Sequence, residues 1–439
     1  MKPISATLFH RLKSKMESET FKSLYRKRHS DFVRKRVLGF SDLLFLQLHR
    51  MSKSLSIELV KFFKLAQRPF CSKQAFSKAR KKLKHEAFME LNRGYVLDYY
   101  GLQENVKKYL GTYSLVAVDG SLVQLPESEG VASFFGRWGN QTGQGMPMGR
   151  SSVVYDLLNG LNWSGGLFPL SQGETTVFAL QYDWLKGTGI MDVREYLLFL
   201  FDRGYPGFDL FNNLEKDGHC FVARCRASFS RETRLFAESG KQEGAVTLYP
   251  TDYTTKKGEK RKSSTTQPIQ LRIVHILLPS GQDEYLLTNT SLTREQLYEV
   301  YGLRWGVETY YGFLKEGLEL ENFSAKTVEG VLQDYHAALL LGNVASVLID
   351  EAQQQLDEEQ AKKDNKHQYK VNKNVALGLI RAPLMELLLG RIQNPETELE
   401  ALRQILVKQK VAVVPNRKFP RHKQKRSRRK FHRNKISPL

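Results

Sequence analysis

Three carboxylates near the middle of the chain have the types and contexts that suit metal-dependent chemistry on phosphate groups. Asp119 follows the apolar run in YSLVAVDGS, Asp202 follows the fully apolar run 197–201, and Glu308 is the one carboxylate in YGLRWGVETYYGFLK. Two carboxylates at neighbouring strand ends repel each other unless a cation lies between them. Carboxylate oxygens are the ligands that Mg²⁺ prefers, and two ions can stabilise the attacking and leaving oxygens of a phosphodiester. The three residues are therefore candidate catalytic residues and metal ligands.

Each aspartate alone has an ordinary alternative explanation. Asp-Gly after Val118 and Asp-Arg-Gly after Phe201 are good turn sequences, and for either residue taken singly the turn is the favoured interpretation. What favours a site is the pair of strand ends, because sites in open α/β sheets form at the carboxyl ends of strands.

The third carboxylate is predicted to lie on a helix that begins near Arg294, since Thr293 and Gln296 form a capping box. Spacings of three and four residues place one set of side chains on a common face: Tyr301, Arg304, Glu308, Tyr311 and Lys315. A different face, apolar and able to pack on a sheet, carries Val300, Leu303, Val307 and Leu314.

An ion-pair ladder of Arg304, Glu308 and Lys315 is the alternative interpretation of that face. Three glycines in the same stretch, at 302, 306 and 312, count against it. Each destabilises a helix by up to about 1 kcal/mol, and close approach of a backbone or a bulky ligand would explain them.

Bulk composition points to a polyanionic partner. The 439 residues include 67 Lys and Arg against 46 Asp and Glu, a formal charge of +21 with a pI near 9.7. Such an excess favours nucleic acid. The longest uncharged apolar run, 337–349, is too short to span a membrane, so we expect a soluble intracellular protein. Cys220 and Cys225 match no zinc spacing and are expected to lie in the core or in a strand.

The chain reads as an α/β protein with helical ends. Residues 1–36 are expected to form a loosely packed arm, and a short basic helix after Ser72 could contact DNA through Lys78, Arg80, Lys81 and Lys82, or simply be solvated. We predict these divisions: 1–105, helical and DNA-binding; 106–218, first part of the core; 219–292, a β-rich insertion; 293–345, core helices; 346–410, C-terminal helices; 411–439, a disordered basic tail.

These motifs together resemble the DDE transposases of bacterial insertion sequences, specifically insertion sequence family four. VAVDGS, FLFDRGYPGFDLFNNLEKDGHCFVAR and YLLTNT resemble the regions around the first two acidic residues and the strand that closes the insertion. Tyr301, Arg304, Glu308 and Lys315 reproduce the Tyr-x2-Arg-x3-Glu-x6-Lys signature. The resemblance covers about residues 40–345, with SKQAFSKARKKLKHEAF as its N-terminal DNA-binding segment and PNRKFPR near the end. Ser121 departs from the more usual Thr.

The resemblance implies a ribonuclease-H-like core with a β-rich insertion between Asp202 and Glu308. It implies Mg²⁺-dependent cut-and-paste transposition with two ions, for which Mn²⁺ can substitute. Asp119 would bridge the ions, while Asp202 and Glu308 would each hold one. Tyr301, Arg304, Lys315 and Arg203 would contact DNA. The partners would be the terminal inverted repeats and target DNA, bound by a dimer on paired ends, in the bacterial cytoplasm at the nucleoid.

Two rival functions stay open. A ribonuclease-H-like nuclease would need the three carboxylates without strand transfer, but not the signature around Glu308. A domesticated, non-catalytic DNA-binding protein would need only the basic segments, yet all three candidate ligands are intact.

Overall fold

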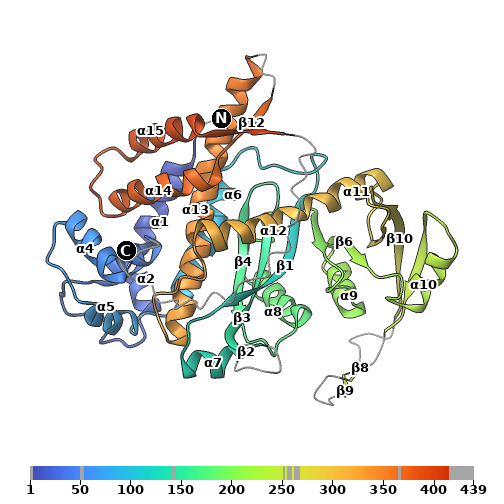
Figure 1. Cartoon of the computed structure of the whole chain (residues 1–439), viewed down its shortest axis with the longest axis horizontal. Coiled ribbons are helices and arrows are strands. Elements are labelled where there is room, and N and C mark those ends of the chain that lie inside the picture. Colours follow the sequence, from blue (N-terminus) through green and yellow to red (C-terminus); the bar gives the residue numbers. More distant parts are fainter. Residues whose placement is uncertain are drawn as a thin grey trace.

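The computed structural model describes residues 3–49, 54–139, 145–250, 253–254, 260–261, 267–363 and 367–414. Within them, helices come first, a nine-stranded sheet follows, and helices return towards the C-terminal end (Figure 1). This confirms the mixed α/β class predicted from the sequence. The tail predicted over 411–439 begins too early, because residues 411–413 belong to a strand, β13 (Lys410–Val413), that pairs with β12 (Gln368–Val371). The rest of the predicted tail, beyond Val414, lies outside the described residues.

Two apolar strands lie at the centre of the sheet. β1 (Ser114–Gln124) pairs in parallel with β5 (Leu197–Phe201) and antiparallel with β3 (Met146–Asp156). β4 (Leu161–Phe168) pairs antiparallel with β3, and β6 (Cys220–Cys225) pairs in parallel with β5. All five residues of β5 are buried, as expected for a continuous apolar run in a parallel pair covered on both faces.

The strands of region 219–292 extend this sheet. β6 pairs with β11 (Asp283–Thr288), β11 with β10 (Ile269–Leu277), and β10 with β7 (Glu243–Leu248), all three antiparallel. β6, β7 and β10 lie in the apolar stretches HCFVARC, EGAVTLYP and IQLRIVHILLP. They are joined edge to edge to the central strands, so one sheet runs from β2 to β7 (Figure 1).

Alternating side chains of β5 pack against different helices on the two faces of the sheet. On one face, Phe178 of α8 (Glu174–Lys186) contacts Phe201, with ring centroids 5.3 Å apart. On the other, Leu198 belongs to a core cluster with Leu297 and Val300 of α11 (Arg294–Leu303).

The N-terminal residues are packed rather than loose, so the prediction of an arm over 1–36 is wrong. α1 (Ser5–Glu17) buries Leu8, Leu12 and Met16, whose four-residue spacing forms an apolar stripe. α2 (Glu19–Tyr25) follows directly. The prediction gave too much weight to the charged residues of this stretch, because Arg11 and Lys15 pair with Asp98 and Glu90 of α6 (Glu86–Leu102), each at 2.7 Å.

A 34-residue helix, α13 (Val328–Ala361), lies beside the sheet against β4 and contacts both the N-terminal and the C-terminal helices (Figure 1). Within it the apolar run 337–349 is buried except for Ser346. No helix among the described residues combines the length and apolarity that a membrane crossing requires. The remaining elements are α3 (Phe40–Leu48), α4 (Leu55–Ala66), α5 (Lys73–Arg80), α6 (Glu86–Leu102), α7 (Glu129–Phe135), α9 (Phe208–Lys216), α10 (Arg231–Glu238), α12 (Trp305–Gly312), η1 (Phe313–Gly317), α14 (Lys373–Leu388), α15 (Pro395–Lys408), β2 (Arg137–Trp138), β8 (Tyr253–Thr254), β9 (Lys260–Arg261), β12 (Gln368–Val371) and β13 (Lys410–Val413).

Candidate active site

Asp119 and Asp202 come directly after the last residue pair of the parallel pairing between β1 and β5. That pairing ends at Val118 and Phe201, and each aspartate is the next residue along the chain. Asp202 follows the end of β5, as predicted. The sequence predicted that Asp119 also ends its strand, and this is wrong. β1 stays paired with β3 beyond that point, and Asp119 lies opposite Val153.

The pKa of Asp119 responds to the charges of both other carboxylates, Asp202 and Glu308. The pKa of Asp119 is raised to about 6: burial contributes most, and the carboxylates of Glu308 and Asp202 also raise it. The Arg304 guanidinium and the Gly120 N–H oppose this rise. Residues 119, 202 and 308, which are far apart in the sequence, therefore act on one another electrostatically.

Glu308 is carried by a helical segment that changes its hydrogen bonding near Arg304. The Thr293 and Gln296 capping box is confirmed at the start of α11. α11 ends at Leu303 and α12 begins at Trp305. At this junction the main-chain hydrogen bonds join residues three apart, from the Arg304 N–H to the Tyr301 oxygen and from the Val307 N–H to the Arg304 oxygen. This break explains why the predicted single faces hold only in part: Val300, Val307 and Leu314 are buried as predicted, but Leu303 is 39% exposed.

Arg304 is the cation of the site. Its Nη2 donates a 2.6 Å hydrogen bond to Glu308 Oε1, and its side chain is only 8% exposed. Burial lowers the pKa of Arg304, but Tyr301, Glu308, Asp202 and Asp119 together outweigh burial and raise it. The guanidinium thus offsets charge on all three carboxylates.

Of the remaining residues predicted on the Glu308 face, Tyr301 is buried without a hydrogen-bond partner among the described residues, whereas Tyr311 and Lys315 hydrogen bond to β1. Burial raises the pKa of Tyr301, and its hydroxyl has no hydrogen-bond partner among the described residues. The Tyr311 hydroxyl donates to the main-chain oxygen of Asp119 at 3.1 Å. Lys315 Nζ donates to Ser121 Oγ at 2.6 Å and to the main-chain oxygen of Leu122 at 2.8 Å. Tyr311 and Lys315 therefore fasten the Glu308 helix to β1.

Buried polar atoms without partners gather beside the two aspartates. Asp202 Oδ1 and Arg304 Nη1 are both buried and have no hydrogen-bond partner among the described residues. Buried polar groups in proteins are nearly always paired. An unpaired carboxylate oxygen beside two more carboxylates is a donor set that fits a hard divalent cation such as Mg²⁺.

A second group of possible metal ligands lies elsewhere. In the described part of the chain, His85, Glu86 and Glu329 alone bring three such atoms within 4.8 Å of one another. Glu329 there pairs with Lys27 at 3.2 Å. Asp119, Asp202 and Glu308 are less tightly grouped, with the Arg304 charge acting among them.

Only one of the three helix glycines has the close neighbour expected from the sequence. A Cβ at Gly306 would lie 2.9 Å from the Leu157 side chain, whereas one at Gly302 or Gly312 would meet no described atom within 4 Å. The prediction that a neighbouring backbone approaches these glycines closely is therefore wrong at Gly302 and Gly312. Close approach of a ligand at these two positions stays a prediction.

The structure corrects one predicted DNA contact. Arg80 is 4% exposed and hydrogen bonds to Asp334 at 3.0 Å and to Gln333 at 2.9 Å on α13. A signal was present in the sequence, because Arg80 lies four residues after Phe76 and three before Leu83, both buried. Of the other predicted contacts, Lys78, Lys81 and Arg203 are exposed, and Lys82 pairs with Asp31 at 3.4 Å.

Glu174 is a neighbour of the site that sequence reasoning missed. A Cβ at Gly120 would lie 3.2 Å from Glu174 Oε1, and one at Gly204 would lie 3.1 Å from Oε2. The carboxylate therefore lies close to the backbone after both aspartates, where it accepts a 2.8 Å hydrogen bond from Arg150. Nothing in the local sequence of Glu174 indicates this position.

Comparison with known proteins identifies the family. Residues 110–343, which are 234 of the 439 residues, match the family described as Transposase DDE domain, and the chain belongs to this family. A piggyBac transposase synaptic complex with hairpin DNA, seen by cryo-EM, is 11% identical with a TM-score of 0.46, over 93% of this chain and 86% of that one. At that distance the similarity places no residue. Among curated proteins, no sequence matches this chain significantly.

Proposed function

We propose that this protein is a transposase of the type found in insertion sequence family four, which cuts DNA at the ends of its element and joins those ends to target DNA. One observation carries the proposal. Asp119, Asp202 and Glu308 come together where the parallel pairing of the central strands β1 and β5 ends, around the buried Arg304. The site includes the Tyr-Arg-Glu-Lys signature as Tyr301, Arg304, Glu308 and Lys315. The Transposase DDE domain family supports the same chemistry.

The strand order supports a ribonuclease-H-like core. β4, β3 and β1 are antiparallel neighbours, and β5 and β6 continue the sheet in parallel with β1. α9 connects β5 to β6, as a parallel crossover requires. In this assignment, β11, β10 and β7 belong to the insertion between Asp202 and Glu308, and residues 1–105 form the DNA-binding part.

Asp119, Asp202 and Glu308 would hold two Mg²⁺ ions, or Mn²⁺ in their place, with Asp119 shared. Bound there, the ions would supply stabilisation of the attacking and leaving oxygens of the phosphodiester. Arg304 places a cation beside these ligands, and its hydrogen bond uses Glu308 Oε1, so Glu308 could serve as a ligand through Oε2.

The protein's own residues would position the DNA strand. Arg304 can donate two parallel hydrogen bonds to a phosphate, a geometry that Lys cannot copy. Tyr301 has a hydroxyl without a partner among the described residues that can donate to a phosphate oxygen. Tyr311 and Lys315 would keep Glu308 in register with Asp119, because both hydrogen bond to β1.

The partners would be the element's terminal inverted repeats and target DNA. The charge of +21 suits this role, and exposed Lys78, Lys81 and Arg203 are the cations available for phosphate contacts. Pairing two ends implies a dimer on DNA, and the site of action would be the nucleoid in the bacterial cytoplasm.

Purified protein incubated with linear DNA carrying its own element ends, a supercoiled target plasmid and Mg²⁺ tests the proposal. We expect cleavage at the end and covalent joining to the plasmid, both lost without divalent metal. Cleavage without joining would support the nuclease instead. Binding without cleavage, in Mg²⁺ and in Mn²⁺, would support a non-catalytic DNA-binding protein.

A further inference from the structure

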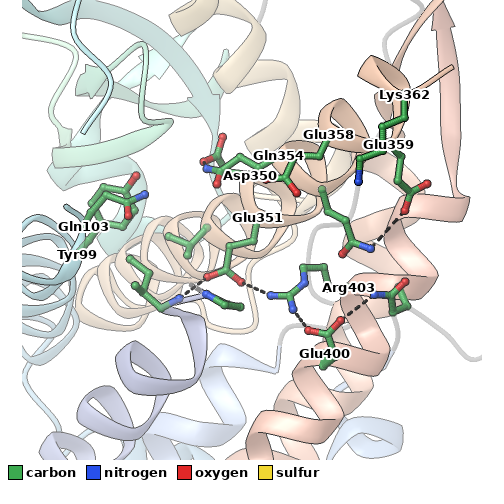
Figure 2. Close-up of a pocket in the computed structure, with 15 residues that line it drawn as sticks. Tyr99, Gln103, Asp350, Glu351, Gln354, Glu358, Glu359, Lys362, Glu400 and Arg403 are labelled. Carbon is green, nitrogen blue, oxygen red and sulfur yellow. Dashed lines mark hydrogen bonds and ion pairs between the residues drawn. The ribbon is translucent and has the colours of Figure 1, made fainter. Parts of the chain in front are cut away.

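An acidic cavity lies far from the candidate active site in this otherwise basic protein. It has a volume of about 390 Å³ and is bounded by α13, α15, the end of α6 and the start of α1 (Figure 2). Five of its lining side chains are carboxylates: Asp350, Glu351, Glu358, Glu359 and Glu400.

Lys362 and Arg403 are the cations in the lining, which leaves a formal excess of three negative charges from five carboxylates and two cations. Some of this charge is matched internally. Arg403 pairs with Glu400, and with Glu351 at 3.6 Å, and Lys107 pairs with Asp350. Even so, a surface hollow with net negative charge in a chain of net charge +21 is suited to a cationic occupant.

The chain itself contains a cationic segment that begins close by. β13 pairs with β12, and Val413 lies opposite Gln368. β12 in turn is held on α13, where Gln360 Nε2 donates a 3.0 Å hydrogen bond to the main-chain oxygen of Tyr369. α15, which leads into β13, supplies Glu400, Arg403 and Gln404 to the cavity wall.

Residues 415–439, here called the tail, contain 11 Lys and Arg and no Asp or Glu. Twenty-five residues can reach up to about 80–90 Å when extended. The part of α13 that lines the cavity, from Val347 to Lys362, is only about 22 Å long. Length therefore does not prevent the tail from reaching the cavity of its own chain.

We infer that the acidic cavity binds the basic tail of the same chain when DNA is absent, and that DNA competes for the tail. DNA phosphates and the cavity carboxylates attract the same side chains, so only one can hold them at a time. Both attractions are ionic and weaken as salt screens them. This inference does not depend on the proposed catalytic chemistry.

Limited trypsin digestion of the full chain tests this. Tryptic sites in the tail should be cut several-fold more slowly at low salt than in 0.5 M NaCl, and the Glu358→Gln/Glu359→Gln variant should lose most of that protection. A matched variant on α10, Glu232→Gln/Glu238→Gln, should keep it. Equal tail cleavage in wild type and the cavity variant at low salt would overturn the inference.

Carbodiimide cross-linking with peptide mapping identifies the occupant. Links from tail lysines, such as Lys423 or Lys425, to Glu358 or Glu359 within one chain are the expected result. The cavity variant should also bind random-sequence duplex about two- to five-fold more tightly at low salt. Links found only between two chains, or no links from the tail to the cavity, would contradict binding by the same chain.

Discussion

Arg304 and Glu308 are joined by a 2.6 Å hydrogen bond on a helical segment that packs against β1. The pair lies one helical turn apart, which alone would be an ordinary helix ion pair. Its burial, and the action of the same guanidinium on Asp119 and Asp202, distinguish it from a solvated pair. Arg304 therefore offsets part of the negative charge of all three carboxylates.

Arg304→Lys separates the two roles of this residue. A lysine preserves a positive charge near Glu308 but cannot make two parallel hydrogen bonds to a phosphate. We expect the variant to bind element ends and make the first nick, but to complete the double-strand break at least about ten-fold more slowly. Gel analysis of nicked and fully cut products over time measures this. Wild-type rates for both steps would reduce Arg304 to an ion-pair partner.

Removal of residues 418–439 tests the tail's contribution to DNA affinity. The deletion removes Lys and Arg side chains that contact phosphates without reading sequence, so the dependence of log affinity on log salt should become shallower. The preference for element ends over random DNA should stay unchanged. Binding titrations at four salt concentrations measure both, and loss of the preference would make the tail the sequence reader.

Arg80→Ala is expected to act on stability. Arg80 and Asp334 form a buried ion pair at 3.0 Å, and removing one partner of such a pair typically destabilises by about 3–5 kcal/mol. Urea unfolding should show a loss of that order. Lys78→Ala, at an exposed position of the same helix, should change stability by less than about 0.5 kcal/mol. An unfolding free energy unaffected by Arg80→Ala, together with lost DNA binding, would restore Arg80 as a DNA contact.

Because His336 is buried, we expect the free energy of unfolding to decrease as the pH falls below about 6.5. The pKa of His336 is lowered to about 3: burial contributes most, the His85 charge also lowers it, and Glu329 opposes both. In the unfolded chain the imidazole titrates near the ordinary histidine pKa of about 6.5. As pH falls from 6.5 towards 3, the unfolded state gains a proton that the folded state does not, so the free energy of unfolding decreases.

His336→Phe keeps an aromatic ring between His85 and Tyr335 and removes this titration. The variant should lose stability less steeply between pH 6.5 and 4 than the wild type in urea unfolding. His10→Phe, at an exposed position, is the control and should leave the slope unchanged. An unchanged slope in His336→Phe would mean that this histidine is protonated in the folded state as readily as in the unfolded state.

Local patterns allowed some of these features to be predicted from the sequence and not others. Asp202 at the end of β5 and the Thr293 cap were predictable, because an apolar run or a capping box is complete within a few residues. The spacing of Arg80 from Phe76 and Leu83 indicates that Arg80 is buried, but its partner Asp334 lies on α13, 254 residues away. The anchoring of Lys315 likewise depends on Ser121 in β1. Long-range contacts of this kind leave little trace in the local sequence.

The central claim is that Asp119, Asp202 and Glu308 form one metal-dependent catalytic site. Cleavage of end-bearing DNA in Mg²⁺ by Asp119→Asn, Asp202→Asn and Glu308→Gln, measured alongside end binding, tests it most directly. The account predicts that each variant binds the ends within about three-fold of wild type and loses at least about 1,000-fold in cleavage rate, while Glu316→Gln, an exposed carboxylate on the same helical segment, cleaves normally. Near-normal cleavage by any one of the three variants would remove that residue from the site and contradict the account.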